Sequence, residues 1–87
     1  MDAVANIAKV YFGNPDDYDV VKNTDIMHHD LLDTGTHTWT QDVEQLMFVC
    51  DVDPLCIGFN TNGFLKVADE GRYTISGVDL YLKKSAQ

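Results

Sequence analysis

The chain of 87 residues is short of several residue types, and each shortage excludes a class of protein. Only 6 residues are Lys or Arg against 14 Asp or Glu, giving a net charge of -8. We therefore expect no direct nucleic-acid binding, since binding to phosphate backbones needs clustered cations. The 2 prolines and 6 glycines fall singly, and no repeat, linker or low-complexity tract divides the chain. No apolar run approaches the ~20 residues that span a bilayer, so we expect no membrane insertion.

Apolar residues are plentiful enough to build a core. They make up 45% of the chain, with 10% aromatic residues, which favours a folded domain over disorder. We expect one domain over residues 1–87, because the length leaves no room for two. Such small domains are marginally stable, so a single crosslink would matter. The first residues do not resemble a targeting segment, because Asp2 is acidic and Lys9 interrupts the apolar stretch.

The first half of the chain predicts extended segments separated by turns. β-branched and aromatic residues favour a strand over residues 4–12, and Gly, Asn, Pro and Asp predict a turn over 13–17. Residues 18–27 suggest a second, irregular strand around Val20 and Val21. Residues 28–38 are expected to form a loop.

The clearest helix is expected from about Thr40 to Asp51, with Thr38 or Thr40 as its cap. Apolar residues recur there with helical spacing and would form one stripe lying on a core. Pro54 should stop the helix. The stripe consists of Val43, Leu46, Met47 and Cys50.

Alternating patterns predict further strands after the helix. Residues 56–60 form one strand, Asn62-Gly63 predicts a type I′ hairpin turn, and residues 64–68 return as its partner. A final strand is expected over residues 78–83. The fold class is therefore α+β, a small antiparallel sheet with one α-helix packed across it. Its mutually buried core is expected to contain Leu46, Met47, Ile57, Phe59, Leu80 and Leu82.

The 2 cysteines are placed where they could meet. Cys50 lies near the end of the predicted helix and Cys56 opens the next strand, so a helix turning back onto its sheet could bring them within disulfide distance. Two buried free thiols are an equally good interpretation of the spacing. A metal site is less favoured, because no second pair of ligands accompanies them.

The run DVEQLMFVCDVDPLCIGFNTNGFLK, followed by SGVDLYLKK, resembles the PAN/apple domain family. The resemblance covers residues 40–84, and Cys50, Cys56 and Phe59 match the family pattern. It implies that the two cysteines form the bridge tying the helix to the sheet. It also implies an extracellular module without catalytic function that binds proteins or carbohydrates. The sequence departs from most of the family in lacking further cysteines.

Metal, cofactor and catalytic sites are not expected. Neighbouring His28 and His29 point to opposite sides of an extended chain, so a solvated loop explains the cluster with Asp30 better than a metal. Residues 16–19 carry three aspartates without the glycine and glutamate of a calcium-binding EF-hand loop. No nucleophile motif or phosphate-binding loop occurs.

Aromatic residues are the better candidates for ligand binding. Tyr18 in the acidic segment and Trp39 before the helix combine apolar area with a polar tip, as do Tyr73 and Tyr81. The alternative is that Trp39 packs against the helix start and the tyrosines complete the edge of the core.

The leading hypothesis is a recognition module without enzymatic activity that binds a protein or glycan, in an extracellular, cell-surface or virion protein. The alternative is a small acidic intracellular inhibitor, or nucleic-acid mimic, that occupies a basic groove of a partner protein. The redox state of the cysteines separates the two, because a disulfide is typical of oxidising compartments.

Overall fold

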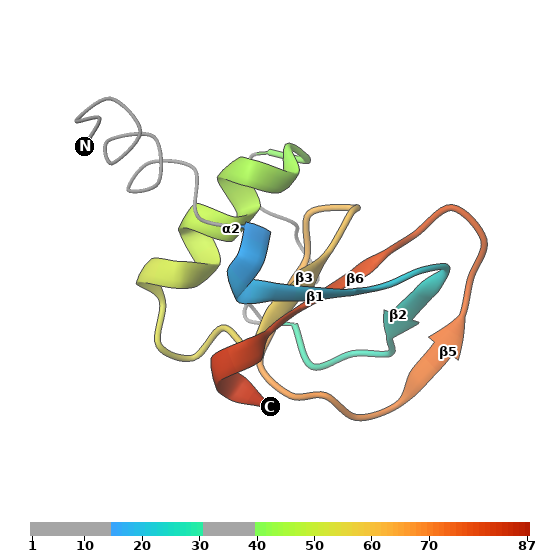
Figure 1. Ribbon diagram of the computed structural model, residues 1–87. Helices are drawn as coiled ribbons and strands as arrows, with labels where there is room; N and C mark the ends of the chain where they lie inside the picture. The colour runs from blue at the N-terminus through green and yellow to red at the C-terminus, as the bar shows by residue number, and fades with distance from the viewer. Residues whose placement is uncertain (1–14, 31–39) are drawn as a thin grey trace.

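The computed structural model describes residues 15–30 and 40–87 (Figure 1). The strand expected over residues 4–12 and the side chain of Trp39 lie outside these ranges. The described elements are, in chain order, the 3-10 helix η1 (Pro15–Asp17), β1 (Tyr18–Val21), β2 (Thr24–Ile26), α2 (Val43–Val52), β3 (Gly58–Asn60), β4 (Leu65–Lys66), β5 (Arg72–Thr74), β6 (Leu80–Lys83) and the 3-10 helix η2 (Lys84–Ala86).

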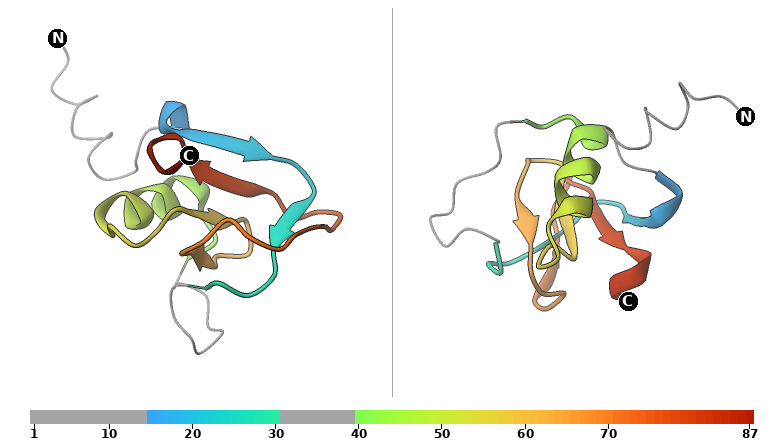
Figure 2. Two further views of the ribbon diagram at one scale, coloured as in Figure 1. Left: turned by 90° about the horizontal axis from the view of Figure 1, so that it is seen from below. Right: turned by 90° about the vertical axis from the view of Figure 1, so that its left-hand side faces the viewer.

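Two antiparallel sheets organise the described chain. The larger has the strand order β1-β6-β3-β4, and the smaller pairs β2 with β5. Helix α2 packs beside the larger sheet, while the β2–β5 ribbon extends away from the helix (Figures 1 and 2). The predicted α+β class, with one helix on a small antiparallel sheet, is confirmed.

The start of α2 differs from the prediction. Asp42 caps the helix, because its carboxylate accepts a hydrogen bond from the backbone N–H of Gln45 at 3.2 Å. The Thr40 hydroxyl instead accepts from the backbone N–H of Asp42 at 3.0 Å, one step before the helix. The predicted stripe is nevertheless the buried one, with Leu46, Met47 and Cys50 inside.

The hairpin between β3 and β4 is present, but its turn is not type I′. The N–H of Gly63 donates to the carbonyl of Asn60 at 3.0 Å, and of the Asn62-Gly63 pair only Gly63 has a positive φ, 98°. The Asn60 side-chain oxygen accepts from the N–H groups of Asn62 and Phe64, each at 3.0 Å. A side chain on the strand therefore organises a longer loop than the dipeptide rule predicts.

The core residues form two clusters instead of the single cluster expected. Leu46, Met47 and Phe59 lie between the helix and one face of the sheet. Leu80 and Leu82 pack with Ile26 of β2, and partly buried Ile57 joins them. The reason is strand alternation, which points Leu80 and Leu82 away from the helix while Tyr81 between them packs against the helix-side cluster.

Candidate binding site

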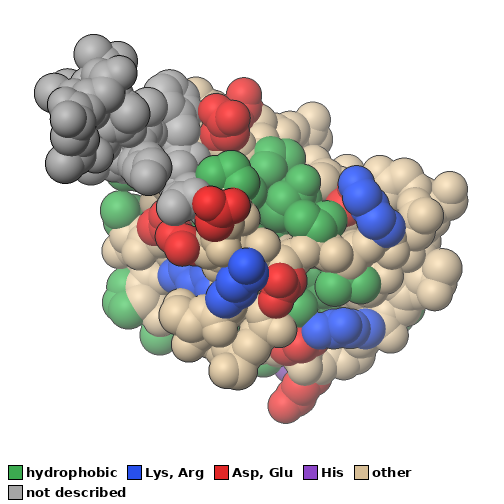
Figure 3. Space-filling view, viewed as in Figure 1, with side chains coloured by type: hydrophobic (Ala, Val, Ile, Leu, Met, Phe, Trp, Pro, Cys, Tyr) green, Lys and Arg blue, Asp and Glu red, His purple; other side chains and the backbone are tan. Residues whose placement is uncertain are grey.

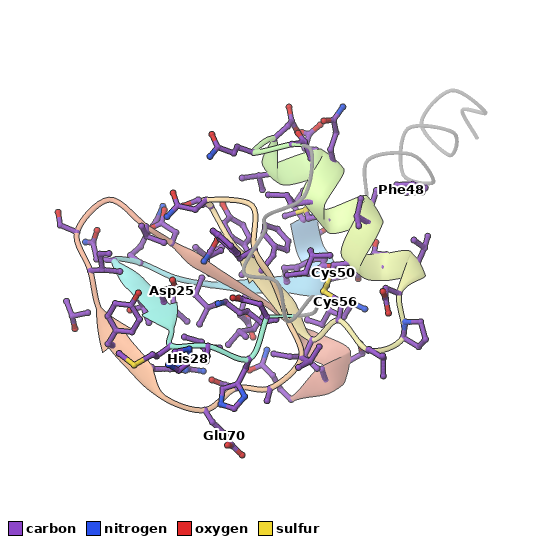
Figure 4. The ribbon with its side chains drawn as sticks, turned by 180° about the vertical axis from the view of Figure 1, so that it is seen from behind. Asp25, His28, Phe48, Cys50, Cys56 and Glu70 are labelled. Atoms are coloured by element: carbon purple, nitrogen blue, oxygen red, sulfur yellow. A yellow bond between two sulfur atoms is a disulfide. The ribbon has the colours of Figure 1, made fainter. Side chains whose placement is uncertain are left out.

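The two cysteines form a disulfide. The Cys50 and Cys56 sulfur atoms are bonded, their Cα atoms are 5.2 Å apart, and both residues are buried (Figure 4). The bridge joins the last turns of α2 to the segment that leads into β3. The interpretation as two free thiols is therefore wrong, and the corner between helix and sheet is covalently closed.

Tyr18 is not the exposed aromatic that its place in an acidic segment suggested. Only 4% of the residue is exposed, and its ring lies against Phe59 in the helix-side core. Its hydroxyl group donates to the Asp51 carboxylate at 2.6 Å and lies 3.1 Å from the Met47 carbonyl. Tyr18 therefore joins β1 to α2, which corrects the expectation that it presents a ligand-binding surface.

A polar hollow lies where the β2–β5 ribbon approaches the β3–β4 hairpin. Its volume is about 220 Å³. Strand β2 contributes Asp25, β3 contributes Asn60, β4 contributes Lys66 and β5 contributes Tyr73, so the hollow gathers side chains from four strands. Phe64 and His28 also line the hollow.

Lys66 is the buried lysine in the lining of this hollow, with 2% of the residue exposed. Its ammonium group donates to the backbone carbonyls of Ile26 at 3.0 Å and His28 at 3.2 Å, and to the Asp30 carboxylate in a closer contact. The Asp25 carboxylate lies 3.9 Å from the same nitrogen. Three acceptors match the three donors of an ammonium group.

Asp25 is held by neighbours on several sides. One carboxylate oxygen accepts from the Ile26 N–H at 2.7 Å and from the Asn60 side-chain amide at 3.0 Å. The other accepts from the Tyr73 hydroxyl at 3.3 Å. These bonds fix a buried carboxylate beside a buried ammonium group, the arrangement that keeps buried charge tolerable.

Two exposed residues with large apolar side chains, Met27 and Tyr73, stand at the rim of the hollow. Tyr73 is 37% exposed and Met27 is 53% exposed. Partial burial, followed by the nearby Asp25 carboxylate, raises the pKa of the Tyr73 hydroxyl above its ordinary value. The phenol is therefore neutral at physiological pH and presents a flat ring at the rim with its hydroxyl directed to Asp25.

His28 and His29, near the end of the range 15–30, do not form a metal site with other described residues. His28 and His29 both have positive φ angles, 62° and 57°, so the chain turns sharply there instead of running extended. The His29 Nε2 atom lies 3.9 Å from the Glu70 carboxylate, and the Asp30 carboxylate forms an ion pair with Lys66. In the ranges 15–30 and 40–87, no three metal-binding side chains come together.

A second hollow, about 340 Å³, lies at the other end of the sheet between η1, the end of α2 and η2. Its lining consists of Asp17, Asp51, Lys83, Lys84 and Ser85. Acidic and basic groups of equal number line it without an aromatic ring. It therefore offers no aromatic ring for stacking against a ligand, unlike the hollow at Tyr73.

Sequence reasoning named the disulfide but missed the polar hollow. Lys66 alternates with apolar neighbours in a short strand, which gave no sign that it would be buried. No family model, curated protein or solved structure matches the chain. Within the described ranges, no helix combines the length and hydrophobicity needed to cross a membrane.

Proposed function

We propose that this protein is a recognition module without enzymatic activity, of the PAN/apple type, which binds a protein or carbohydrate ligand at the hollow beside Tyr73. The observation that carries the proposal is the position of Tyr73. Among the aromatic residues in the described ranges it is the most exposed, and it stands at the rim of a hollow with buried polar groups.

The size of the hollow limits what enters it. Small-molecule pockets usually measure roughly 300 to 1,000 Å³, and this one measures about 220 Å³. A single sugar ring or one side chain of a partner protein fits that space better than a larger cofactor. Recognition then uses the Tyr73 ring for apolar contact, with Asp25 beneath it as a hydrogen-bond acceptor.

The disulfide supports an extracellular, cell-surface or virion location, because such bonds persist in oxidising compartments. It also supports the family resemblance, since it joins the helix to the sheet in the way that the family pattern implies. A rigid helix-sheet frame lowers the entropy cost of presenting a binding surface.

A glycan array and a pull-down, each with the intact disulfide-bonded chain, test the proposal. Once a ligand is found, its dissociation constant is measured for Tyr73→Ala and for Leu55→Ala. Leu55 is the matched control, because it is 66% exposed and lies at the disulfide corner outside the lining of the hollow. Tyr73→Ala should weaken binding roughly tenfold or more, as loss of an aromatic anchor does, and Leu55→Ala should not.

The opposite pattern would place the binding surface at the disulfide corner and overturn the assignment to the hollow. Absence of any glycan or protein ligand in both assays would contradict the recognition function itself. Folding of each variant is checked by circular dichroism before binding is measured.

The acidic inhibitor or nucleic-acid mimic is the second candidate. Asp16, Asp17 and Asp19 are exposed on η1 and β1 and could face a basic groove. On the face shown in Figure 3, however, acidic side chains are interspersed with Lys and Arg. A mimic of a phosphate backbone needs a continuous acidic row, so this face supports the recognition module more than the mimic.

A further inference from the structure

Lys66 has an unusual charge environment for a side chain that is almost fully buried. Its nitrogen faces two carboxylates, of Asp30 in direct contact and of Asp25 at 3.9 Å. One positive charge therefore meets two negative charges in a site where the Lys66 side chain is 3% exposed. Keeping such charges out of water carries a large desolvation cost, even for a well-paired group.

Condensation of Lys66 with Asp30 would remove the part of that cost that belongs to this pair. We propose that Lys66 and Asp30 are joined by an intramolecular isopeptide bond between Nζ of the lysine and Cγ of the aspartate. The bond converts an ammonium group and a carboxylate into one neutral amide. It leaves Asp25 as the remaining charge, held by its bonds to Ile26, Asn60 and Tyr73.

The residues around the pair supply what the reaction requires. Asp25 lies 3.9 Å from the Lys66 nitrogen, so it accepts a proton from the ammonium group through one water and acts as the general base. Asp25 passes this proton to one oxygen of Asp30, so that a neutral carboxyl group is the electrophile, and the lysine nitrogen attacks its Cγ and forms the carbon–nitrogen bond. The nitrogen then gives a second proton to the same oxygen, and the carbon–oxygen bond breaks. One water molecule leaves, and no oxidant is consumed.

The surrounding structure holds the two reacting groups together. The carbonyl groups of Ile26 and His28 orient the lysine nitrogen, and the Phe64 ring lies 5.8 Å from it. Asp30 is fixed opposite Lys66 by a backbone β-bridge between the same two residues. Such positioning turns an encounter between two groups into a reaction within one molecule.

The bond would crosslink segments that the disulfide leaves free. Asp30 and Lys66 are 36 positions apart, whereas Cys50 and Cys56 are separated by 6. A crosslink that closes a longer loop restricts the unfolded chain more strongly. It would tie the segment after β2 to β4, in a domain whose size alone provides little stability.

Intact-mass measurement of the full chain tests the inference. We expect a mass below that of the disulfide-bonded sequence by one water molecule, and this deficit should persist after reduction and alkylation of the cysteines. Proteolysis should yield one branched peptide that contains both Lys66 and Asp30. A mass equal to that of the disulfide-bonded sequence, with Lys66 and Asp30 in separate linear peptides, would overturn the inference.

Variants exclude water loss elsewhere, such as cyclisation of another aspartate. Lys66→Arg should restore the full mass, and a deficit that persists in it would contradict the inference. Lys22→Arg is the matched control, because Lys22 pairs with Asp79 at 3.1 Å on the surface, and it should keep the deficit.

Two further variants test the roles of the carboxylates, including the case in which Lys66→Arg fails to fold. Asp30→Asn should lose ammonia instead of water, since the nitrogen then leaves from the amide. Asp25→Asn removes the general base and should keep the full mass in a chain whose circular dichroism is unchanged. A water deficit retained in folded Asp25→Asn would contradict the role of Asp25.

Discussion

The rings of Phe59 and Tyr81 stack across neighbouring strands, with centroids 5.0 Å apart and planes 5° apart. Their Cα atoms are paired in the register between β3 and β6. The Tyr18 ring approaches Phe59 at 5.6 Å with a tilt of 59°. Phe59 is thus enclosed by aromatic rings from both β1 and β6, and it is completely buried.

Replacement of Phe59 should therefore be costly. We expect Phe59→Ala to lower the free energy of unfolding by about 3 kcal/mol or more, because it leaves a cavity among rings that cannot close around it. Urea unfolding measures the change. Val20→Ala is the control, since Val20 is 43% exposed, and it should alter stability by about 0.5 kcal/mol or less. A loss below about 1 kcal/mol for Phe59→Ala would show that its surroundings collapse into the space.

Much of this core could be predicted from the sequence, because helix and strand periodicities are local. The stripe of Leu46, Met47 and Cys50 and the alternation of Leu80 with Leu82 follow directly from spacing. Periodicity does not reveal which face of a strand meets which element. The division of the core into two clusters depends on β2, a strand of 3 residues with a weak pattern.

The polar hollow could not be predicted for a related reason. Asp25, Asn60 and Lys66 come from three separate strands and meet only through the sheet topology. The aspartates beside Tyr18 suggest exposure to solvent, whereas the hydrogen-bond partner of its hydroxyl group, Asp51, lies 33 positions away in the sequence. Long-range pairing of polar groups leaves no periodic trace in the sequence.

The disulfide should contribute measurably to stability. Opening the loop between Cys50 and Cys56 by reduction should lower the free energy of unfolding by about 2 kcal/mol, in the chain-entropy account of short loops. Intact mass should rise by two hydrogen atoms on reduction. The double variant Cys50→Ala, Cys56→Ala is the control and should unfold identically with and without reductant. Equal stability of reduced and oxidised wild-type protein would contradict this expectation.

Gly58 should tolerate no side chain. A Cβ atom there would lie 2.2 Å from the Tyr81 carbonyl oxygen on the adjacent strand. We expect Gly58→Ala to cost more than about 2 kcal/mol, because backbone must shift to relieve the overlap. Gly77→Ala separates this effect from backbone strain, since Gly77 has a φ of +86° with open space around it, and should cost about 1 kcal/mol. Thermal unfolding compares the two, and equal losses would contradict the steric explanation.

Tyr18 should make the protein sensitive to alkali. Burial, followed by the hydrogen bond to Asp51, raises the pKa of the Tyr18 hydroxyl in the folded state. Above the ordinary tyrosine pKa of about 10, the unfolded state loses this proton first, so the free energy of unfolding falls as pH rises. Below that pKa, the Tyr18 hydroxyl group makes its full contribution to the free energy of unfolding.

Tyr18→Phe should cost about 1 to 2 kcal/mol at pH 7, through loss of the bond to a charged carboxylate. It should also flatten the fall in stability above pH 10, as followed by urea unfolding over a pH series. Tyr73→Phe is the control. Because Tyr73 is partly exposed, loss of its hydroxyl group should leave most of that fall in place. A fall in stability of the same steepness in Tyr18→Phe and wild type would contradict the assignment.

The salt dependence of ligand binding distinguishes the recognition module from the acidic mimic. If the hollow binds the ligand, affinity depends on the Tyr73 ring and changes little with ionic strength, because apolar contact is not screened. A mimic instead loses affinity steeply with added salt and when its carboxylates are neutralised. The triple variant with Asp16, Asp17 and Asp19 changed to Asn removes three exposed acids and leaves the hollow intact.

Binding to the identified partner should therefore be measured for this triple variant and for Tyr73→Ala across a salt series. We expect the triple variant to bind within about threefold of wild type and Tyr73→Ala to bind roughly tenfold or more weakly at every salt concentration. Trp39→Ala, at the second aromatic position predicted from the sequence, belongs in the same series. Retained affinity in Tyr73→Ala, together with collapse in the Asn variant, would favour the mimic, because binding would then depend on exposed charge.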